Sequence, residues 1–189
     1  ISGFLITAHL VSRPPRRPRD LADFWGRRIR RLLPASLLVL ACTIAAVWLV
    51  APETEWQANA RDAQLAALYV LNWGLAGSAV DYLAADNLPT AVQHFWSLSV
   101  EEQFYFVWPI LVALAVLAGR RSARATTIAL ATTLGAVVLA SFAFSVERTA
   151  SNPAAAYFIT PTRMWELGIG GLVALLVSRR ELPVADLRV

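Results

Sequence analysis

The sequence predicts an all-α fold, a polytopic transmembrane helical bundle with about four full spans. Of its 189 residues, 57% are hydrophobic and only 16% are charged, which is too apolar for a soluble domain of this size. Several uncharged runs approach the roughly 20 residues that a helix needs to cross a bilayer. The basic residues, all arginine, gather in clusters between these runs. Such clusters indicate membrane topology, so no nucleic-acid partner is expected.

Residues 11–31 are expected to form a polar loop ahead of the first span. They carry eight arginines against Asp20 and Asp23, and three prolines are expected to break regular structure. A loop this basic belongs in the cytoplasm. The uncharged run that follows, residues 32–50, is the first predicted span. Its single cysteine, Cys42, cannot form a disulfide within the chain and is expected to be a packing residue.

Three later runs complete the predicted spans. They cover residues 95–118, 126–146 and 158–177. The middle run is the cleanest, whereas the first and the last each carry charged residues near their beginnings. All three have the length of a membrane-crossing helix.

Whether residues 65–80 cross the membrane decides on which side the later arginine clusters lie. This run is apolar but short and is interrupted by Asn72 and several small residues, so it is either a thin span or a re-entrant hairpin. Two more arginine clusters lie at residues 120–124 and 179–180, and the positive-inside rule places every cluster in the cytoplasm. We therefore predict a re-entrant or interfacial segment, which returns to the side that it left.

A polar stretch opens the run at residues 95–118. Because a carboxylate at the bilayer centre costs about 2.5–3.5 kcal/mol on insertion scales, Glu101 and Glu102 are expected to face protein or water. Ser97 shares a helix face with Glu101, and His94 reaches that face only if the helix begins before it. A histidine beside a carboxylate can act as an acid or a base. Alternatively the glutamates pair with arginines of other helices and His94 lies at the interface, which is the favoured interpretation for His94.

A second signal precedes the first span, in the stretch FWGRRIRRLLP at residues 24–34. If this stretch is helical, Arg27 pairs with Arg30 and Arg28 with Arg31 at i,i+3 spacing, so each pair can present two guanidinium groups to one polyanion. A phosphate-rich cofactor would suit this arrangement. A topology signal that also binds anionic lipid explains it equally well.

A third signal is PTRMWELGIGG at residues 161–171. Arg163 and Glu166 stand at i,i+3 and can pair, which reduces the cost of placing each in the membrane. The small residues that follow let another helix approach closely, with Gly170 and Ala174 at the small-xxx-small spacing. This packing interpretation needs no active site.

Together these segments resemble the acyltransferase 3 family, the membrane acyltransferases that O-acylate bacterial surface glycans and some small molecules. The strings RRxRRLLP and FWSLSVEEQFY are specific, and RMWEL with its following glycines also fits. The resemblance covers nearly the whole chain, so residues 1–189 are expected to be one partial acyltransferase 3 transmembrane domain. Residues 1–7 look like the end of the family's second helix.

The resemblance implies acyl-CoA as a cytosolic donor co-substrate, with acetyl-CoA first, and a sugar hydroxyl of a cell-envelope polysaccharide or lipid carrier as acceptor. No metal and no resident cofactor are expected, and membrane lipid is a partner. The arginines would bind the donor phosphates, with Arg28 and Arg31 first. Glu101 and Glu102 would support catalysis. The remaining candidates for substrate-binding or structural roles are His94, Ser99, Arg163 and Glu166.

One departure limits these implications. The catalytic histidine expected for the family lies in its first helix, and neither His9 nor His94 matches that motif. The chain alone is therefore expected to be inactive, with further helices before and after it. The expected location is the cytoplasmic membrane of a bacterium.

Two other functions remain open from the residues. In a secondary transporter or flippase, intramembrane Glu and Arg would form an ion or substrate path, and an inverted repeat would favour this function. In a scaffold or sensor, the charges would only pair and pack. Loss of activity in Arg28→Ala or Glu102→Gln would favour the enzyme over the scaffold.

Overall fold

The computed structural model describes residues 1–80 and 89–181, and this part of the chain is helical without a strand. The all-α prediction is confirmed. In chain order the helices are α1 (Ser2–Ser12), α2 (Pro18–Val50), α3 (Glu53–Ala67), α4 (Leu71–Val80), α5 (Phe95–Gly119), α6 (Ala123–Ser151), α7 (Pro153–Phe158) and α8 (Thr160–Glu181).

Three helices in the described residues, α2, α5 and α6, are long and apolar enough to cross a membrane. They contain the spans predicted at residues 32–50, 95–118 and 126–146. The fourth predicted span, residues 158–177, lies mostly in α8, a helix of 22 residues that is not among those three. The protein is a multi-pass membrane protein.

The predicted loop over residues 11–31 is wrong for most of its length. The link between α1 and α2 is only residues 13–17, and α2 continues without a break through the arginine motif. Pro18 is compatible with a helix start, because the first helical N–H has no partner within the helix. The Asp20 carboxylate caps this end by accepting hydrogen bonds from the backbone N–H groups of Arg16 and Arg17, both at 2.9 Å. These bonds lower the pKa of the exposed Asp20 carboxyl below its ordinary value.

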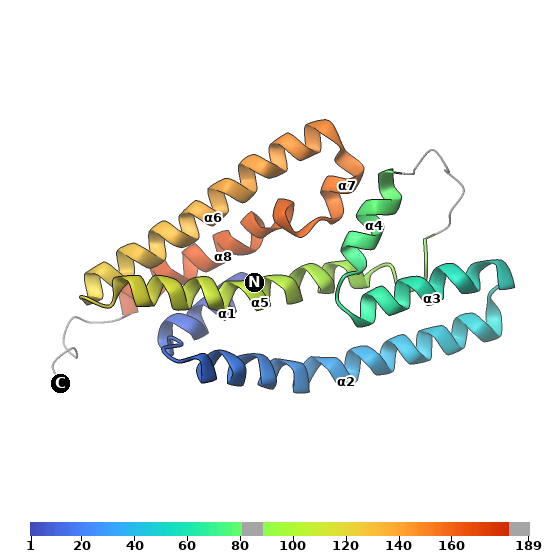
Figure 1. Cartoon of the computed structure of the whole chain (residues 1–189), viewed down its shortest axis with the longest axis horizontal. Coiled ribbons are helices and arrows are strands. Elements are labelled where there is room, and N and C mark those ends of the chain that lie inside the picture. Colours follow the sequence, from blue (N-terminus) through green and yellow to red (C-terminus); the bar gives the residue numbers. More distant parts are fainter. Residues whose placement is uncertain (81–88, 182–189) are drawn as a thin grey trace.

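Residues 65–80 belong to a longer helical hairpin made of α3 and α4. The chain reverses at residues 68–70, where Tyr69 has a φ of 54°, a left-handed conformation that side chains seldom adopt. Figure 1 shows α3 running back from the far end of α2 toward the middle of the molecule, and α4 turning away again. The run at residues 65–80, predicted as re-entrant, therefore consists of the end of α3, the reversal and α4.

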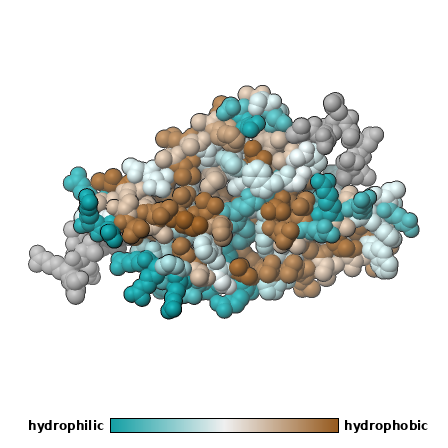
Figure 2. All heavy atoms as spheres, viewed as in Figure 1, coloured by the Kyte–Doolittle hydropathy of each residue, from teal (hydrophilic) through white to brown (hydrophobic). Residues whose placement is uncertain are grey.

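The arginine clusters gather at one end of the molecule. The α1–α2 link, the α5–α6 link and the last turn of α8 all lie at the left in Figure 1, and the α2–α3 link lies at the right. In Figure 2, hydrophilic side chains collect at these two ends, and hydrophobic side chains cover much of the surface between them. This arrangement matches the topology predicted from the arginine clusters.

The main core lies where α1, α5, α6 and α8 pack together. Trp108 of α5 is fully buried, and its indole Nε1 donates to the Thr7 hydroxyl of α1 at 2.8 Å. Small residues bring α8 close to α1, since a Cβ at Gly170 would lie only 2.9 Å from the backbone N of Phe4. Ala174, one turn later, is also buried. The predicted small-residue contact is confirmed, and α1 is the helix that packs there.

Candidate functional site

An ion pair between α2 and α5 forms the centre of the candidate site. The Arg28 guanidinium donates to both carboxylate oxygens of Glu102, with Nη2 at 2.8 Å from Oε1 and Nε at 3.0 Å from Oε2. The two side chains are 26% and 16% exposed. A pair joined by two hydrogen bonds is stronger and more rigid than a single contact. This pairing is the structural alternative that the sequence left open for the glutamates.

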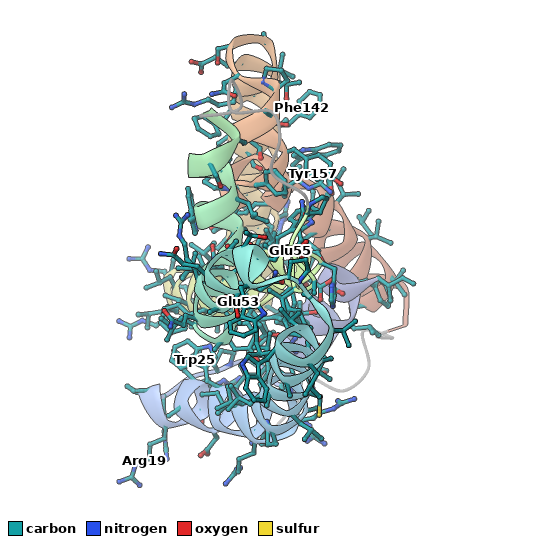
Figure 3. The ribbon with its side chains drawn as sticks, turned by 90° about the vertical axis from the view of Figure 1, so that its right-hand side faces the viewer. Arg19, Trp25, Glu53, Glu55, Phe142 and Tyr157 are labelled. Carbon is teal, nitrogen blue, oxygen red and sulfur yellow. The ribbon has the colours of Figure 1, made fainter. Side chains whose placement is uncertain are left out.

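Aromatic residues also hold α2 against α5 next to this ion pair. The Arg28 guanidinium lies 3.3 Å from the centroid of the Tyr105 ring, one turn along α5 from Glu102. One turn earlier in α2, Trp25 donates from Nε1 to the Tyr105 carbonyl oxygen at 3.2 Å and stacks on Phe106. In Figure 3, Trp25 points from α2 toward the rest of the bundle, whereas Arg19 points away. Arg28 therefore has a fixed orientation against α5.

The other arginines of the motif have different surroundings. Arg27, Arg30 and Arg31 are exposed and make no ion pair with the residues that the structure describes. Arg27 also lines a cavity of about 510 Å³ between the end of α1 and the start of α2. That cavity is bordered by both charge signs, with His9, Arg13, Asp20 and Asp23 on its walls. Of the four arginines predicted to bind the donor, one is therefore paired and three are exposed.

The two adjacent glutamates face different helices. Whereas Glu102 contacts α2, Glu101 accepts a hydrogen bond from the Ser2 hydroxyl of α1 at 3.4 Å. Ser97 donates instead to the carbonyl oxygen of His94. His94 would share a helix face with Ser97 and Glu101 only if the helix began before it. Because α5 begins at Phe95, His94 does not lie on that face.

His94 and Ser99 lie away from the ion pair. His94 is exposed and its ring lies 4.9 Å from that of Phe95. Ser99 is fully buried, and its hydroxyl donates to the Phe95 carbonyl oxygen within α5. Ser99 therefore stabilises the helix locally in this structure.

Arg163 and Glu166 form the predicted i,i+3 pair, at 3.1 Å. The Arg163 guanidinium also lies over two aromatic rings, 5.6 Å from the centroid of Trp96 and 5.4 Å from that of Tyr157. Both members of the pair are partly exposed. This cluster joins the start of α8 to α5 and α7.

The role of Gln103 was not predicted from the sequence. Its amide nitrogen donates to the Tyr69 carbonyl oxygen at 2.8 Å and to Asn72 Oδ1 at 2.9 Å. Its amide oxygen accepts from Trp73 Nε1 and from the Thr160 hydroxyl. All four hydrogen-bonding positions of the amide are used. A glutamine beside two glutamates in an apolar helix, together with an asparagine in residues 65–80, is the sequence signal that could have indicated this network.

The described residues contain no group of three or more His, Cys, Asp or Glu side chains that could hold a metal ion. The ion pair itself brings together a carboxylate, a guanidinium group and a tyrosine ring.

These features define a polytopic helical membrane protein with a charged pair between two of its apolar helices. The family model described as an acyltransferase domain, Acyl_transf_3, matches residues 1–182. The chain belongs to the acyltransferase 3 family, which confirms the resemblance of its motifs.

Relatives from three bacteria are similar over most of this chain. YrhL of Bacillus subtilis, named provisionally as a peptidoglycan O-acetyltransferase, is 33% identical over 96% of the chain. The O-acetyltransferase OatA of Staphylococcus aureus is 33% identical over 93% of it. The peptidoglycan O-acetyltransferase OatA of Listeria monocytogenes is 28% identical over 93%.

The chain spans 28% of the length of each of these relatives. No solved structure matches the chain significantly.

Proposed function

We propose that this chain is part of a membrane-bound O-acyltransferase. The enzyme moves an acyl group, most simply acetyl, from cytosolic acyl-CoA to a hydroxyl of a surface glycan or a lipid-linked sugar. Membership of the acyltransferase family and the names of three relatives support the reaction class. The names of two of them, from Bacillus subtilis and Listeria monocytogenes, include peptidoglycan and support a glycan acceptor. The arginine-rich end then faces the cytosol of a bacterium, across its cytoplasmic membrane.

The observation that carries this proposal is the Arg28–Glu102 pair between α2 and α5, within a run of arginines. Exposed Arg27, Arg30 and Arg31 lie next to this fixed point and leave their guanidinium groups available to the phosphates of a donor. Because Arg28 is occupied by Glu102, its role in the proposal is to position this part of α2 rather than to make the first phosphate contact.

Acyl transfer needs a base for the attacking hydroxyl and hydrogen-bond donors for the oxyanion that develops. In the proposal, Glu101 and Glu102 support the site, since each already accepts a hydrogen bond from a neighbouring helix. Electrostatic support of this kind holds α1, α2 and α5 at a fixed separation around the reacting groups. It requires no metal and no resident cofactor.

The test uses the full-length gene in membranes and follows label from acetyl-CoA to surface glycan. Arg28→Ala and Glu102→Gln should lower kcat by about tenfold or more, equivalent to roughly 1.4 kcal/mol in the barrier. Arg31→Ala should raise the KM for acetyl-CoA by about fivefold, since one surface arginine contributes about 1 kcal/mol to binding an anionic surface. Arg124→Ala, an exposed arginine at the start of α6, is the matched control and should leave both constants unchanged.

Wild-type membranes that transfer no label from any acyl-CoA would refute the proposed function. Transport across the membrane would then be the next hypothesis. Normal transfer by Arg28→Ala and Glu102→Gln, at unchanged protein levels, would refute the assigned role of the ion pair.

A further inference from the structure

An aromatic cluster with an ion pair lies where α5, α7 and α8 begin or end. The Trp96 ring is 4.9 Å from the Tyr157 ring and 5.3 Å from the Phe158 ring, measured between centroids. The Arg163 guanidinium lies over the Trp96 and Tyr157 rings, and Glu166 holds it at 3.1 Å. Three rings and two opposite charges therefore lie close together in this cluster.

This cluster lies toward the end of the molecule opposite the arginine clusters. α5 begins on that side, and α7 follows the end of α6 there. Figure 3 views the molecule from this end and shows Tyr157 above Glu53 and Glu55 of α3. Tyr157 is 53% exposed, and the Arg163 and Glu166 side chains are 31% and 41% exposed. A ligand can reach all three side chains.

We propose that this cluster is a sugar-binding platform, and that it receives the acceptor glycan. The platform is formed by Trp96, Tyr157, Arg163 and Glu166. The inference rests on the proposed function, because it supplies the acceptor subsite of the same reaction on the side away from the donor.

The chemistry of the cluster fits a sugar ring. One face of a pyranose presents C–H groups, which make weak contacts with aromatic rings, and its edge carries hydroxyl groups. A hydroxyl both donates and accepts hydrogen bonds, whereas a carboxylate only accepts and a guanidinium only donates. Glu166 can accept from one sugar hydroxyl while Arg163 donates to the same or the next one. The i,i+3 pair therefore provides both a hydrogen-bond donor and an acceptor for sugar hydroxyls beside the rings.

Two other occupants fit less well. A cationic lipid headgroup would be repelled by the positive charge of the Arg163 guanidinium, which lies over both rings, whereas a sugar ring would not be. Simple anchoring at the membrane interface needs an aromatic ring but no charged pair. Trp48 and Trp56 provide that comparison, because they pair at 6.2 Å near the α2–α3 link, at the same end of the molecule.

The test measures binding without turnover. The full-length protein in detergent is titrated by calorimetry, in the absence of acyl-CoA, with a soluble tetrasaccharide of alternating N-acetylglucosamine and N-acetylmuramic acid. Tyr157→Ala should weaken binding by about threefold to tenfold, the range expected for one lost aromatic contact. Tyr157→Phe should retain binding because the ring remains. Glu166→Gln should weaken binding through loss of the charged acceptor, and Trp48→Ala should leave it unchanged.

The outcomes separate this proposal from the proposed function. No binding by the wild type, equal binding by Tyr157→Ala, or equal loss in Trp48→Ala would overturn the platform. Label transfer with an unchanged acceptor KM in Tyr157→Ala and Glu166→Gln would also overturn it while the acyltransferase stands. Binding that Tyr157→Ala and Glu166→Gln lose, in a wild type that transfers no acyl group, would support the platform and refute the acyltransferase.

Discussion

Arg28 illustrates why residue type matters at this site. The guanidinium uses two nitrogen atoms on one carboxylate and its flat face on Tyr105. A lysine ammonium is a point charge and cannot make both contacts in this geometry. The sequence contains only arginine among its basic residues, so composition alone did not distinguish Arg28 from its neighbours. The contacts of Arg28 with Glu102 and Tyr105 of α5 distinguish it from its neighbours.

A double-mutant cycle tests the energy of this pair. Arg28→Ala, Glu102→Ala and the double variant should show a coupling of about 1–2 kcal/mol in thermal unfolding, because a partly buried pair exceeds an exposed one. The matched cycle on Arg163 and Glu166, an i,i+3 pair that is more exposed, should show no more than about 0.5 kcal/mol. Equal couplings in the two cycles would contradict the assigned rigidity of the first pair.

Two buried indole N–H groups give a second prediction at this scale. Trp108 donates to Thr7, whereas Trp165 Nε1 is buried without a hydrogen-bond partner among the described residues. Trp108→Phe should therefore destabilise the protein by about 1–3 kcal/mol, because it leaves a buried hydroxyl short of a donor. Trp165→Phe should change stability much less, since no hydrogen bond is lost. Thermal unfolding of the full-length protein in detergent would measure both, and a larger loss in Trp165→Phe would contradict the assignment.

At the scale of elements, the glycines of α8 were predictable and their partner was not. Their spacing indicated a helix contact, but only the fold shows that α1 occupies it. Small-residue motifs specify how close a helix comes without naming which helix it is.

Gly170→Ala tests this crossing. The new Cβ would approach the backbone of Phe4 to 2.9 Å, so the two helices must separate, at a cost of about 1–3 kcal/mol. Gly135→Ala in α6 is the matched control, because nothing lies within 4 Å of its added Cβ. That control should be neutral or stabilising, by up to about 1 kcal/mol of helix propensity. Similar melting temperatures for the two variants would exclude a tight α1–α8 contact.

Gln103 explains why the hairpin was only partly predictable. The apolar run at residues 65–80 suggested one short segment, yet the helix boundary falls at residues 68–70, inside that run. The left-handed turn at Tyr69 is stabilised by a hydrogen bond from Gln103, which is 34 positions away in sequence. Local patterns cannot report a contact over that separation.

Gln103→Leu should loosen this turn. Loss of the amide leaves the Tyr69 carbonyl and the buried Asn72 without this partner, so amide exchange at residues 68–73 should become faster. Gln64→Leu, at an exposed position on α3, is the control and should not change exchange there. Unchanged exchange in Gln103→Leu would show that the network does not hold the hairpin.

For the whole molecule, charge and hydropathy predicted the fold better than helix-breaking residues did. The lengths of the apolar runs predicted the positions of three spans. The arginine clusters were correctly expected at one end of the molecule. Proline content wrongly predicted a loop before the first span, because a proline at the first helical position is compatible with a helix. The candidate site residues were selected as sequence motifs, but the pairing of Arg28 with Glu102 depends on the packing of α2 on α5.

Cysteine labelling from each side of the membrane tests the topology as a whole. In a Cys42→Ser background, single cysteines at the end of α1 and in the α5–α6 link should label from one side, and those at the α2–α3 and α6–α7 junctions from the other. The positions are Ser12→Cys and Ser122→Cys for the first side, and Ala51→Cys and Asn152→Cys for the second. This labelling is expected because α2, α5 and α6 each have the length and apolarity to cross the membrane, and because the α3–α4 hairpin is predicted to return to its own side. If residues 65–80 crossed fully, Ser122→Cys would label from the same side as Ala51→Cys, and the common end of the arginine clusters would be lost.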